Sequence, residues 1–264
     1  MTNVTLQNPS MDQASNSNDT LHKNQNAVVL LSGGLDSVTC LYWAKARYAS
    51  VTAVSFDYGQ RHNSELVAAK RIAETAGVNH RIIDIDIAQL GGSSLTDHSM
   101  IVPDGDTDKF PNKKHDEIDN DAIPNTYVPA RNTIFLSYAL AVAEVTDANH
   151  IVIGVSSVDY SGYPDCRPDF ANTLQQMHNH ALEGLYPVTL YTPYIHKTKA
   201  DIASDAALYH VPIEQTWSCY KGNDIHCGKC GTCVERIEAL HLAKVNDPTT
   251  YEDHEFWRSQ INKV

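Results

Sequence analysis

The chain has 264 residues, enough for one large domain or for one and a half. Its 20 Lys and Arg residues against 32 Asp and Glu give a formal net charge of −12, and such an acidic surface repels nucleic-acid backbones. No apolar run approaches the roughly 20 residues of a membrane span, and the N-terminus lacks the basic start and apolar stretch of a secretory signal. We therefore expect a cytoplasmic protein that binds neither nucleic acid nor membrane.

The order of polar and apolar segments predicts the fold class. Residues 1–25 are mostly Asn, Gln, Ser, Thr and Asp, a composition typical of a disordered tail. Short apolar runs then alternate with segments of helical periodicity, which predicts an α/β fold: a doubly wound, Rossmann-like parallel sheet covered by helices on both faces. The predicted strands are 27–31, 51–56, 81–87 and 151–155, and the predicted helices are 38–47, 64–77 and a segment around 135–142.

Two further segments complete the predicted domain organisation. A polar stretch near 93–125, rich in Asp, Asn and Pro, is too long for a plain connection and is expected to be a flexible lid. It interrupts a nucleotide-binding domain that we assign to residues 26–210. Residues 211–264 are expected to form a C-terminal metal-binding and helical segment.

The first strand is followed by Ser32-Gly33-Gly34-Leu35-Asp36-Ser37. Glycines at a strand-to-helix turn let the backbone approach an anion closely, and the N–H groups and dipole of the following helix favour phosphate. The alternative is a tight turn in which Ser or Asp only caps the helix. The complete string favours phosphate, so the predicted nucleotide-binding residues are Leu31 and the six residues of the loop.

Four of the six cysteines, Cys219, Cys227, Cys230 and Cys233, lie within fifteen residues. This spacing suits a metal ion better than a disulfide framework, and four thiolates can close a tetrahedron around Zn²⁺. A full shell leaves no position for water, which predicts one structural zinc per chain. An iron–sulfur cluster is the competing interpretation. The neighbouring His226 is expected to be a surface residue and not a ligand.

Ligands of open parallel sheets bind beyond the carboxyl ends of the strands. Arginine offers a planar fork to carboxylates, a helix start attracts anions, and Asp can accept paired N–H donors. Each candidate also has a simpler explanation as a surface ion pair or a helix-capping residue. The predicted substrate-binding residues are Arg61, Arg131, Asn132, Asp165, Arg167 and Asp169.

The SGGLDS string resembles the signature of the PP-loop ATP pyrophosphatases, which release pyrophosphate from ATP while transferring AMP. Further strings resemble the 7-cyano-7-deazaguanine synthase family of queuosine biosynthesis, and together they span about residues 27–245. They are FDYGQRH at 56–62, PNTYVPARN at 124–132, SGYPDCRPDF at 161–170, TPYIHKTK at 192–199, and SCY with the cysteines at 218–233.

The resemblance implies ATP- and Mg²⁺-dependent conversion of 7-carboxy-7-deazaguanine and ammonia to the nitrile, through adenylated acid and amide intermediates. It implies catalytic roles for Asp36, Lys197 and Arg167, with Lys199 ranked below Lys197. Asp36 would either contact Mg²⁺ or only orient the loop. The chain length leaves no room for a glutaminase domain, so free ammonia is expected. The oligomeric state stays open, a homodimer included.

Two other functions are compatible with the same loop. A tRNA-modifying PP-loop enzyme would need a reactive cysteine near the loop, for which only Cys166 is available, and a basic surface that the charge of −12 disfavours. A nucleotide sensor or zinc-knuckle binding module would bind ATP without turnover.

Overall fold

The computed structural model describes residues 22–105, 123–222 and 224–261. Within these residues, five strands form one sheet in the order β3-β2-β1-β4-β5, and each neighbouring pair is parallel. This confirms the predicted doubly wound sheet. The strands are β1 (His22–Leu30), β2 (Tyr48–Asp57), β3 (Asn79–Asp84), β4 (His150–Val152) and β5 (Thr189–Tyr191).

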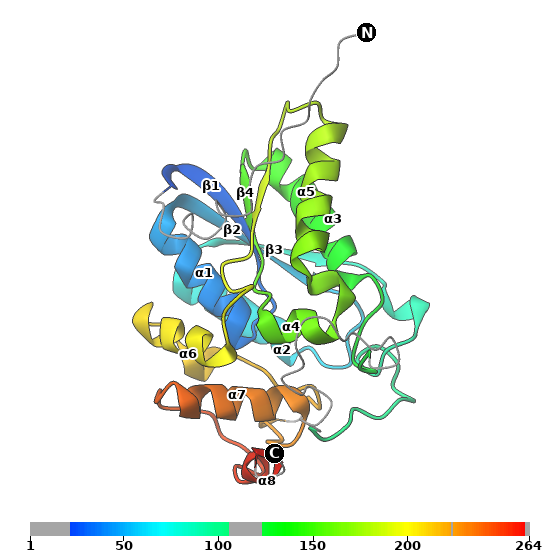
Figure 1. The fold of residues 1–264 in the computed structure, drawn as a ribbon, viewed down its shortest axis with the longest axis vertical. Coiled ribbons are helices and arrows are strands. Elements are labelled where there is room, and N and C mark those ends of the chain that lie inside the picture. Colours follow the sequence, from blue (N-terminus) through cyan, green and yellow to red (C-terminus); the bar gives the residue numbers. More distant parts are fainter. Residues whose placement is uncertain (1–21, 106–122, 223, 262–264) are drawn as a thin grey trace.

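Helices cover both faces of the sheet, as Figure 1 shows. The core on one face contains residues of α1 (Leu35–Arg47), α2 (Ser64–Ala76) and α6 (Lys199–Leu208). The core on the other face contains residues of α3 (Arg131–Val145) and α5 (Pro168–Ala181). The remaining helices are α4 (Ser157–Gly162), α7 (Gly231–Leu242) and α8 (Phe256–Ile261), with short 3-10 turns η3 (Ala88–Leu90), η6 (Pro164–Cys166) and η7 (Ile213–Gln215).

The central strand is apolar on both faces because successive side chains of a strand point to opposite sides. Ala27 and Val29 of β1 pack into the core beneath α1, whereas Val28 and Leu30 pack into the core beneath α3. The chain runs outward from β1 to β3 and then returns to β4 on the other side of β1. This reversal places the switch point, where ligands of such sheets bind, at the carboxyl ends of β1 and β4.

The element boundaries differ from the predicted ones in several places. Strand β1 begins at His22, inside the segment expected to be a tail, because its polar start pairs with β2 at Tyr48. Strand β5 was not predicted: it has only three residues, too few for a periodic pattern. Helix α2 ends as predicted, with Gly77 in the left-handed conformation at φ 65°.

The expected lid is packed where the structure describes it. Ser93 and Leu95 are buried, and the Gly105 N–H donates to the carbonyl of Lys229, which lies between Cys227 and Cys230 in the chain. Residues 106–122 lie outside the described residues. No helix among the described residues is long and apolar enough to cross a membrane.

Gly33 is expected to tolerate no side chain. Its φ is 92°, and a Cβ there would lie 2.3 Å from the carbonyl oxygen of Glu65 in α2. We predict that Gly33→Ala lowers the free energy of unfolding by about 3 kcal/mol or more, measured by urea denaturation. Gly77→Ala is the matched control, since Gly77 also has positive φ but nothing lies within 4 Å of its added Cβ. That change should cost about 1–2 kcal/mol. Equal losses would contradict close packing of the loop on α2.

Candidate functional site

The loop Ser32–Ser37 lies at the switch point, between the end of β1 and the first turn of α1. The Ser32 N–H donates to Ser37 Oγ at 3.1 Å, and Ser37 Oγ donates to the Gly34 carbonyl at 3.0 Å. Gly34 is the N-cap of α1, and no side-chain cap bond is made there. The first N–H groups of α1 can therefore bind an anion, which the helix dipole also favours.

The neighbours of the loop fix its position. Leu31 and Leu35 are buried in the core and anchor its two ends, so they can contact a ligand only through their backbone. The Trp217 N–H donates to the Gly33 carbonyl at 2.9 Å. On the other side, a Cβ added to Gly154 after β4 would lie 3.2 Å from the Asp36 backbone. The two loops at the switch point are therefore in contact.

Lys199 provides the positive charge at the loop. Its ammonium lies 2.5 Å from Asp36 Oδ2 and 3.1 Å from Asp159 Oδ1. Asp159 is oriented by the Ser156 N–H and hydroxyl, which donate to it at 2.8 and 2.7 Å. Burial raises the pKa of Asp36, although the charge of Lys199 acts in the opposite direction. Three elements, α1, α4 and α6, thus hold one half-buried charge network.

Of the two lysines in the TPYIHKTK string, the structure places Lys199 at the loop and Lys197 away from it. The Lys197 ammonium lies 2.9 Å from Asp205 on α6 and is 42% exposed, whereas Lys199 is only 16% exposed. Lys199 is the first residue of α6, after a capping box made by Thr198 and Asp201. The capped helix start therefore directs Lys199 toward Asp36, and the sequence string alone could not distinguish the two lysines.

Sequence reasoning also missed two acidic residues of this network, Asp159 and Glu235. Burial raises the pKa of Glu235 on α7 to about 7, with the charge of Lys199 acting against the shift. Glu235 reaches the site because α7 packs against α6, a contact between distant segments. The sequence did contain a signal for Asp159, since Ser156 and Asp159 have the spacing of a capping box at the start of a helix after β4.

Asn132 and Asp165 meet, but they bind each other. The Asn132 N–H donates to Asp165 Oδ2 at 3.0 Å, and the Asn132 amide donates to the Asp165 carbonyl at 3.2 Å and to Cys166 Sγ at 3.2 Å. Burial raises the pKa of Asp165. These bonds connect the start of α3 to η6, so both residues have a structural role.

The predicted arginines lie in three different settings. Arg61 Nη2 donates to the carbonyls of Asp97 and Met100 at 3.1 and 2.8 Å and so holds the loop after η3. Arg167 is the N-cap of α5, and its Nε is buried without a hydrogen-bond partner among the described residues. Arg131 is the first residue of α3; burial raises the pKa of the Tyr58 hydroxyl, and the positive charge of Arg131 acts in the opposite direction.

The last predicted substrate residue, Asp169, is exposed in the first turn of α5. None of its contacts brings it to the loop Ser32–Ser37 within the described part of the chain. The three charged residues of the D-x-R-x-D string therefore differ in environment. Asp165 is buried, Asp169 is exposed, and Arg167 Nε has no hydrogen-bond partner among the described residues.

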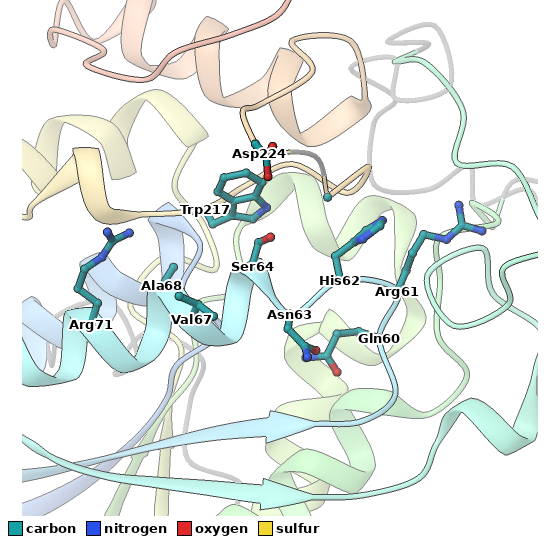
Figure 2. Close-up of a pocket in the computed structure, with 11 residues that line it drawn as sticks. Gln60, Arg61, His62, Asn63, Ser64, Val67, Ala68, Arg71, Trp217 and Asp224 are labelled. Atoms are coloured by element: carbon teal, nitrogen blue, oxygen red, sulfur yellow. The ribbon is translucent and has the colours of Figure 1, made fainter.

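A cavity of about 600 Å³ opens beside the loop. Figure 2 shows the Trp217 indole above Ser64 and Ala68 of α2, with Arg61 toward one end and Arg71 toward the other. The cavity adjoins the loop because two of its lining residues contact Gly33. A Cβ added to Gly33 would lie 3.3 Å from the Ala68 Cβ, and the Trp217 N–H donates to the Gly33 carbonyl. Its lining carries Arg61 and Arg71 against the single acid Asp224, and this positive balance suits an anionic ligand.

The four clustered cysteines form a candidate metal centre. Their sulfur atoms lie within 4.8 Å of one another, and Cys227 Sγ and Cys233 Sγ are 3.9 Å apart. A tetrahedron with Zn–S bonds of about 2.3 Å has edges of about 3.8 Å, so a single ion fits. The N–H groups of Lys229 and Cys230 donate to Cys227 Sγ at 3.3 Å, which stabilises a thiolate. The cluster can therefore bind one metal ion.

The surroundings of the cysteines correct one prediction and add one residue. His226 is buried, not on the surface: its Nε2 accepts the Ser218 N–H at 3.1 Å and its ring packs on Trp217. Burial lowers the pKa of His226 to about 4. Arg236, which sequence reasoning missed, is buried and donates to Thr216 Oγ1 at 2.7 Å and to the Ile213 carbonyl at 3.0 Å.

Comparisons with known proteins agree with the motifs. The family model described as queuosine biosynthesis protein QueC matches residues 26–244. A 7-cyano-7-deazaguanine synthase of Psychrobacter cryohalolentis is 69% identical over 261 residues, which cover 96% of this chain and 100% of that one. The protein of the same name from Brucella anthropi is 48% identical over 238 residues, 89% of this chain and 97% of that one.

Among solved structures, the NMN synthetase of Francisella tularensis matches with a TM-score of 0.47 and 11% identity, over 90% of this chain and 84% of that one. The family model and the curated relatives each cover most of the chain. They confirm the resemblance inferred from the sequence strings, and the chain belongs to the QueC family of queuosine biosynthesis proteins.

Proposed function

We propose that this chain is a C–N bond-forming ligase that converts 7-carboxy-7-deazaguanine and ammonia to 7-cyano-7-deazaguanine at the expense of ATP. The observation that carries the proposal is the uncapped start of α1 with Lys199 held beside it by Asp36 and Asp159. This arrangement suits a pyrophosphate that must leave ATP. The substrate class comes from the name of relatives that are 69% and 48% identical.

The chemistry explains why ATP is needed twice. A carboxylate oxygen attacks the α-phosphate, pyrophosphate leaves, and the acyl-adenylate that forms can expel AMP when ammonia attacks the acyl carbon. The product of this half is a neutral amide. Its oxygen then attacks the α-phosphate of a second ATP, and the adenylated amide loses AMP and two N–H protons to give the nitrile. We therefore expect two AMP per nitrile.

Each group of the network has a proposed role. The N–H groups at the start of α1 and the Lys199 ammonium stabilise the charge that develops on departing pyrophosphate. Asp36 supplies a carboxylate oxygen of the kind that would hold Mg²⁺, and the bound ion would neutralise charge on the phosphates. The adjoining cavity with Arg61 and Arg71 takes the remainder of the nucleotide. Arg167, whose Nε has no hydrogen-bond partner within residues 22–105, 123–222 and 224–261, would fork onto the substrate carboxylate.

Two observations argue against the alternative functions. Cys166, the thiol that a tRNA-thiolating enzyme would need near the loop, is buried, and burial raises its pKa to about 12. A sensor would not need Lys199 beside the position of the leaving group.

We propose a structural Zn²⁺ at the four cysteines, because one ion fits sulfur atoms this close, whereas a multi-iron cluster holds its cysteines on separate irons.

Lys199→Met should lower the rate of AMP formation at least a hundredfold. The ammonium is expected to stabilise the negative charge on departing pyrophosphate by about 3 kcal/mol in the transition state, and methionine cannot do so. Lys197→Met is the matched control and should stay within threefold of wild type, since Lys197 is exposed and paired with Asp205. Chromatographic assay of AMP and a thermal melt of each variant measure this. A larger loss in the Lys197 variant would return the catalytic role to that residue.

Arg167→Ala should lower nitrile formation about a hundredfold from the acid and much less from the preformed amide. The reason is that only the acid offers a carboxylate for a bidentate, charge-assisted contact. Arg167→Lys should recover part of the loss, since it keeps the charge but not the fork. Nitrile is followed by mass spectrometry with each substrate. Equal defects with both would show that Arg167 does not bind the carboxylate.

Cys230→Ala should remove zinc and lower the melting temperature together, because binding of a structural metal contributes to folding. His226→Gln should keep one zinc per chain, since His226 already accepts the Ser218 N–H and is not needed as a ligand. Metal analysis of the purified variants tests both. Full zinc content in Cys230→Ala would refute the four-cysteine site.

A further inference from the structure

The Lys199 ammonium is fully engaged by carboxylates of the described residues. An ammonium carries three N–H donors, and three carboxylate oxygens lie within hydrogen-bond distance of this one. Asp36 Oδ2 lies at 2.5 Å, Asp159 Oδ1 at 3.1 Å and Asp159 Oδ2 at 3.2 Å. The role proposed above requires Lys199 to donate to departing pyrophosphate. One of the two carboxylates must therefore give up its bond when the nucleotide binds.

Asp159 is held in place by the start of its own helix. The Ser156 N–H and hydroxyl donate to Asp159 Oδ2 at 2.8 and 2.7 Å, and Ser156 is fully buried. The Ser157 hydroxyl donates to the Lys197 carbonyl at 2.9 Å, so the start of α4 is also tied to the chain just before Lys199. Asp159 could move away from Lys199 only by breaking its two bonds from Ser156.

Asp36 is held less firmly. Its carboxylate accepts a hydrogen bond from Lys199 and from no other residue that the structure describes, so Oδ1 is without a partner there. Asp36 stands in the first turn of α1 and is the residue proposed above to hold Mg²⁺. A cation on Asp36 repels the Lys199 ammonium. The bond between Asp36 and Lys199 is therefore the one that nucleotide binding would break.

The charges around Lys199 keep it protonated during such an exchange. Burial alone would lower the pKa of Lys199, but nearby carboxyl groups outweigh burial and raise the pKa well above its ordinary value. These groups come from three helices: Asp159 of α4, Asp36 of α1 and Glu235 of α7. When a cation neutralises Asp36, Asp159 remains as the carboxylate in direct contact with Lys199.

We propose that Asp159 is a positioning residue for Lys199. It keeps the ammonium at the loop when Asp36 binds a cation, so that the N–H released by Asp36 donates to the departing pyrophosphate. Two carboxylates that contact the same lysine thus have different roles, because one is exchanged and the other is permanent. This role for Asp159 rests on the proposed function, which assigns Lys199 to pyrophosphate.

The test compares Asp159→Asn with two other variants. Asparagine keeps an oxygen that can accept from Ser156 but removes the negative charge. Asp205→Asn is the matched control, because Asp205 pairs with Lys197 at 2.9 Å and its side chain is 21% exposed, against 23% for Asp159. Asp36→Asn is the contrasting variant. Thermal melts establish that each variant is folded.

Two measurements do not require turnover. Calorimetry gives the affinity for inorganic pyrophosphate with Mg²⁺, and peptide mass spectrometry gives the rate at which acetic anhydride acetylates Lys199, with Lys197 as the internal standard. In Asp159→Asn the pyrophosphate affinity should fall about tenfold or more, because the ammonium is no longer held at the loop. Acetylation of Lys199 at about pH 9 should rise about tenfold or more, since loss of an opposite charge lowers a lysine pKa by about 1–3. Asp205→Asn should match wild type in both.

The Mg²⁺ concentration needed for half-maximal pyrophosphate binding separates positioning from metal binding. It should rise about tenfold or more in Asp36→Asn and stay within about threefold of wild type in Asp159→Asn. Ser156→Ala is a second variant that decides the matter if Asp159→Asn does not fold. It leaves both carboxylates in place and removes one of the two bonds that hold Asp159, so it should weaken pyrophosphate binding about threefold or more.

Three results would overturn the inference. The first is an Asp159→Asn variant that matches Asp205→Asn in pyrophosphate affinity and in acetylation of Lys199. The second is an Asp159→Asn variant that needs as much Mg²⁺ as Asp36→Asn, which would make Asp159 a metal ligand. The third is a folded Ser156→Ala variant with wild-type affinity for pyrophosphate.

The proposed function fails on a separate measurement. If wild type forms no AMP from ATP and 7-carboxy-7-deazaguanine, the proposed reaction is wrong. Pyrophosphate binding and acetylation of Lys199 do not involve that acid, so they report on Asp159 alone.

Discussion

The absence of a side chain at Gly33 is the constraint on which the site depends. With φ at 92° and the Glu65 carbonyl only 2.3 Å from where a Cβ would stand, the loop can rest directly on α2. Its carbonyl then accepts the Trp217 N–H, which brings the cysteine segment against the same loop. Contacts through one backbone position therefore set how the loop lies against α2, the cysteine segment and the cavity of Figure 2.

Electrostatics at the switch point is dominated by one lysine and several acids. Lys199 contacts Asp36 and Asp159, and Glu235 lies close enough for its pKa to respond to the same charges. The cluster has more carboxyl groups than ammonium groups, so it can accept a further cation. This suits a nucleotide that arrives with Mg²⁺. The network also ties α1, α4 and α6 together, so binding at the loop and the packing of three helices are coupled.

The cysteine segment acts as a scaffold for the site. A metal ion at the four sulfur atoms would fix Tyr220, the residue after Cys219, while Arg236 holds the preceding turn through Thr216 and Ile213. A metal bound there would therefore support the segment that donates to the loop through Trp217.

The amino-acid sequence by itself determined the doubly wound sheet, the phosphate loop, the cysteine cluster and the family, because these depend on periodicity and on residues close together in the chain. Only the tertiary structure decided which lysine contacts Asp36 of the loop, since Lys197 and Lys199 stand in one string and a capped helix start separates their directions. The same holds for Asp165, which accepts the Asn132 N–H, and for Glu235, which lies near Lys199. Their roles come from contacts between distant segments, and the pattern of neighbouring residues contains no record of those contacts.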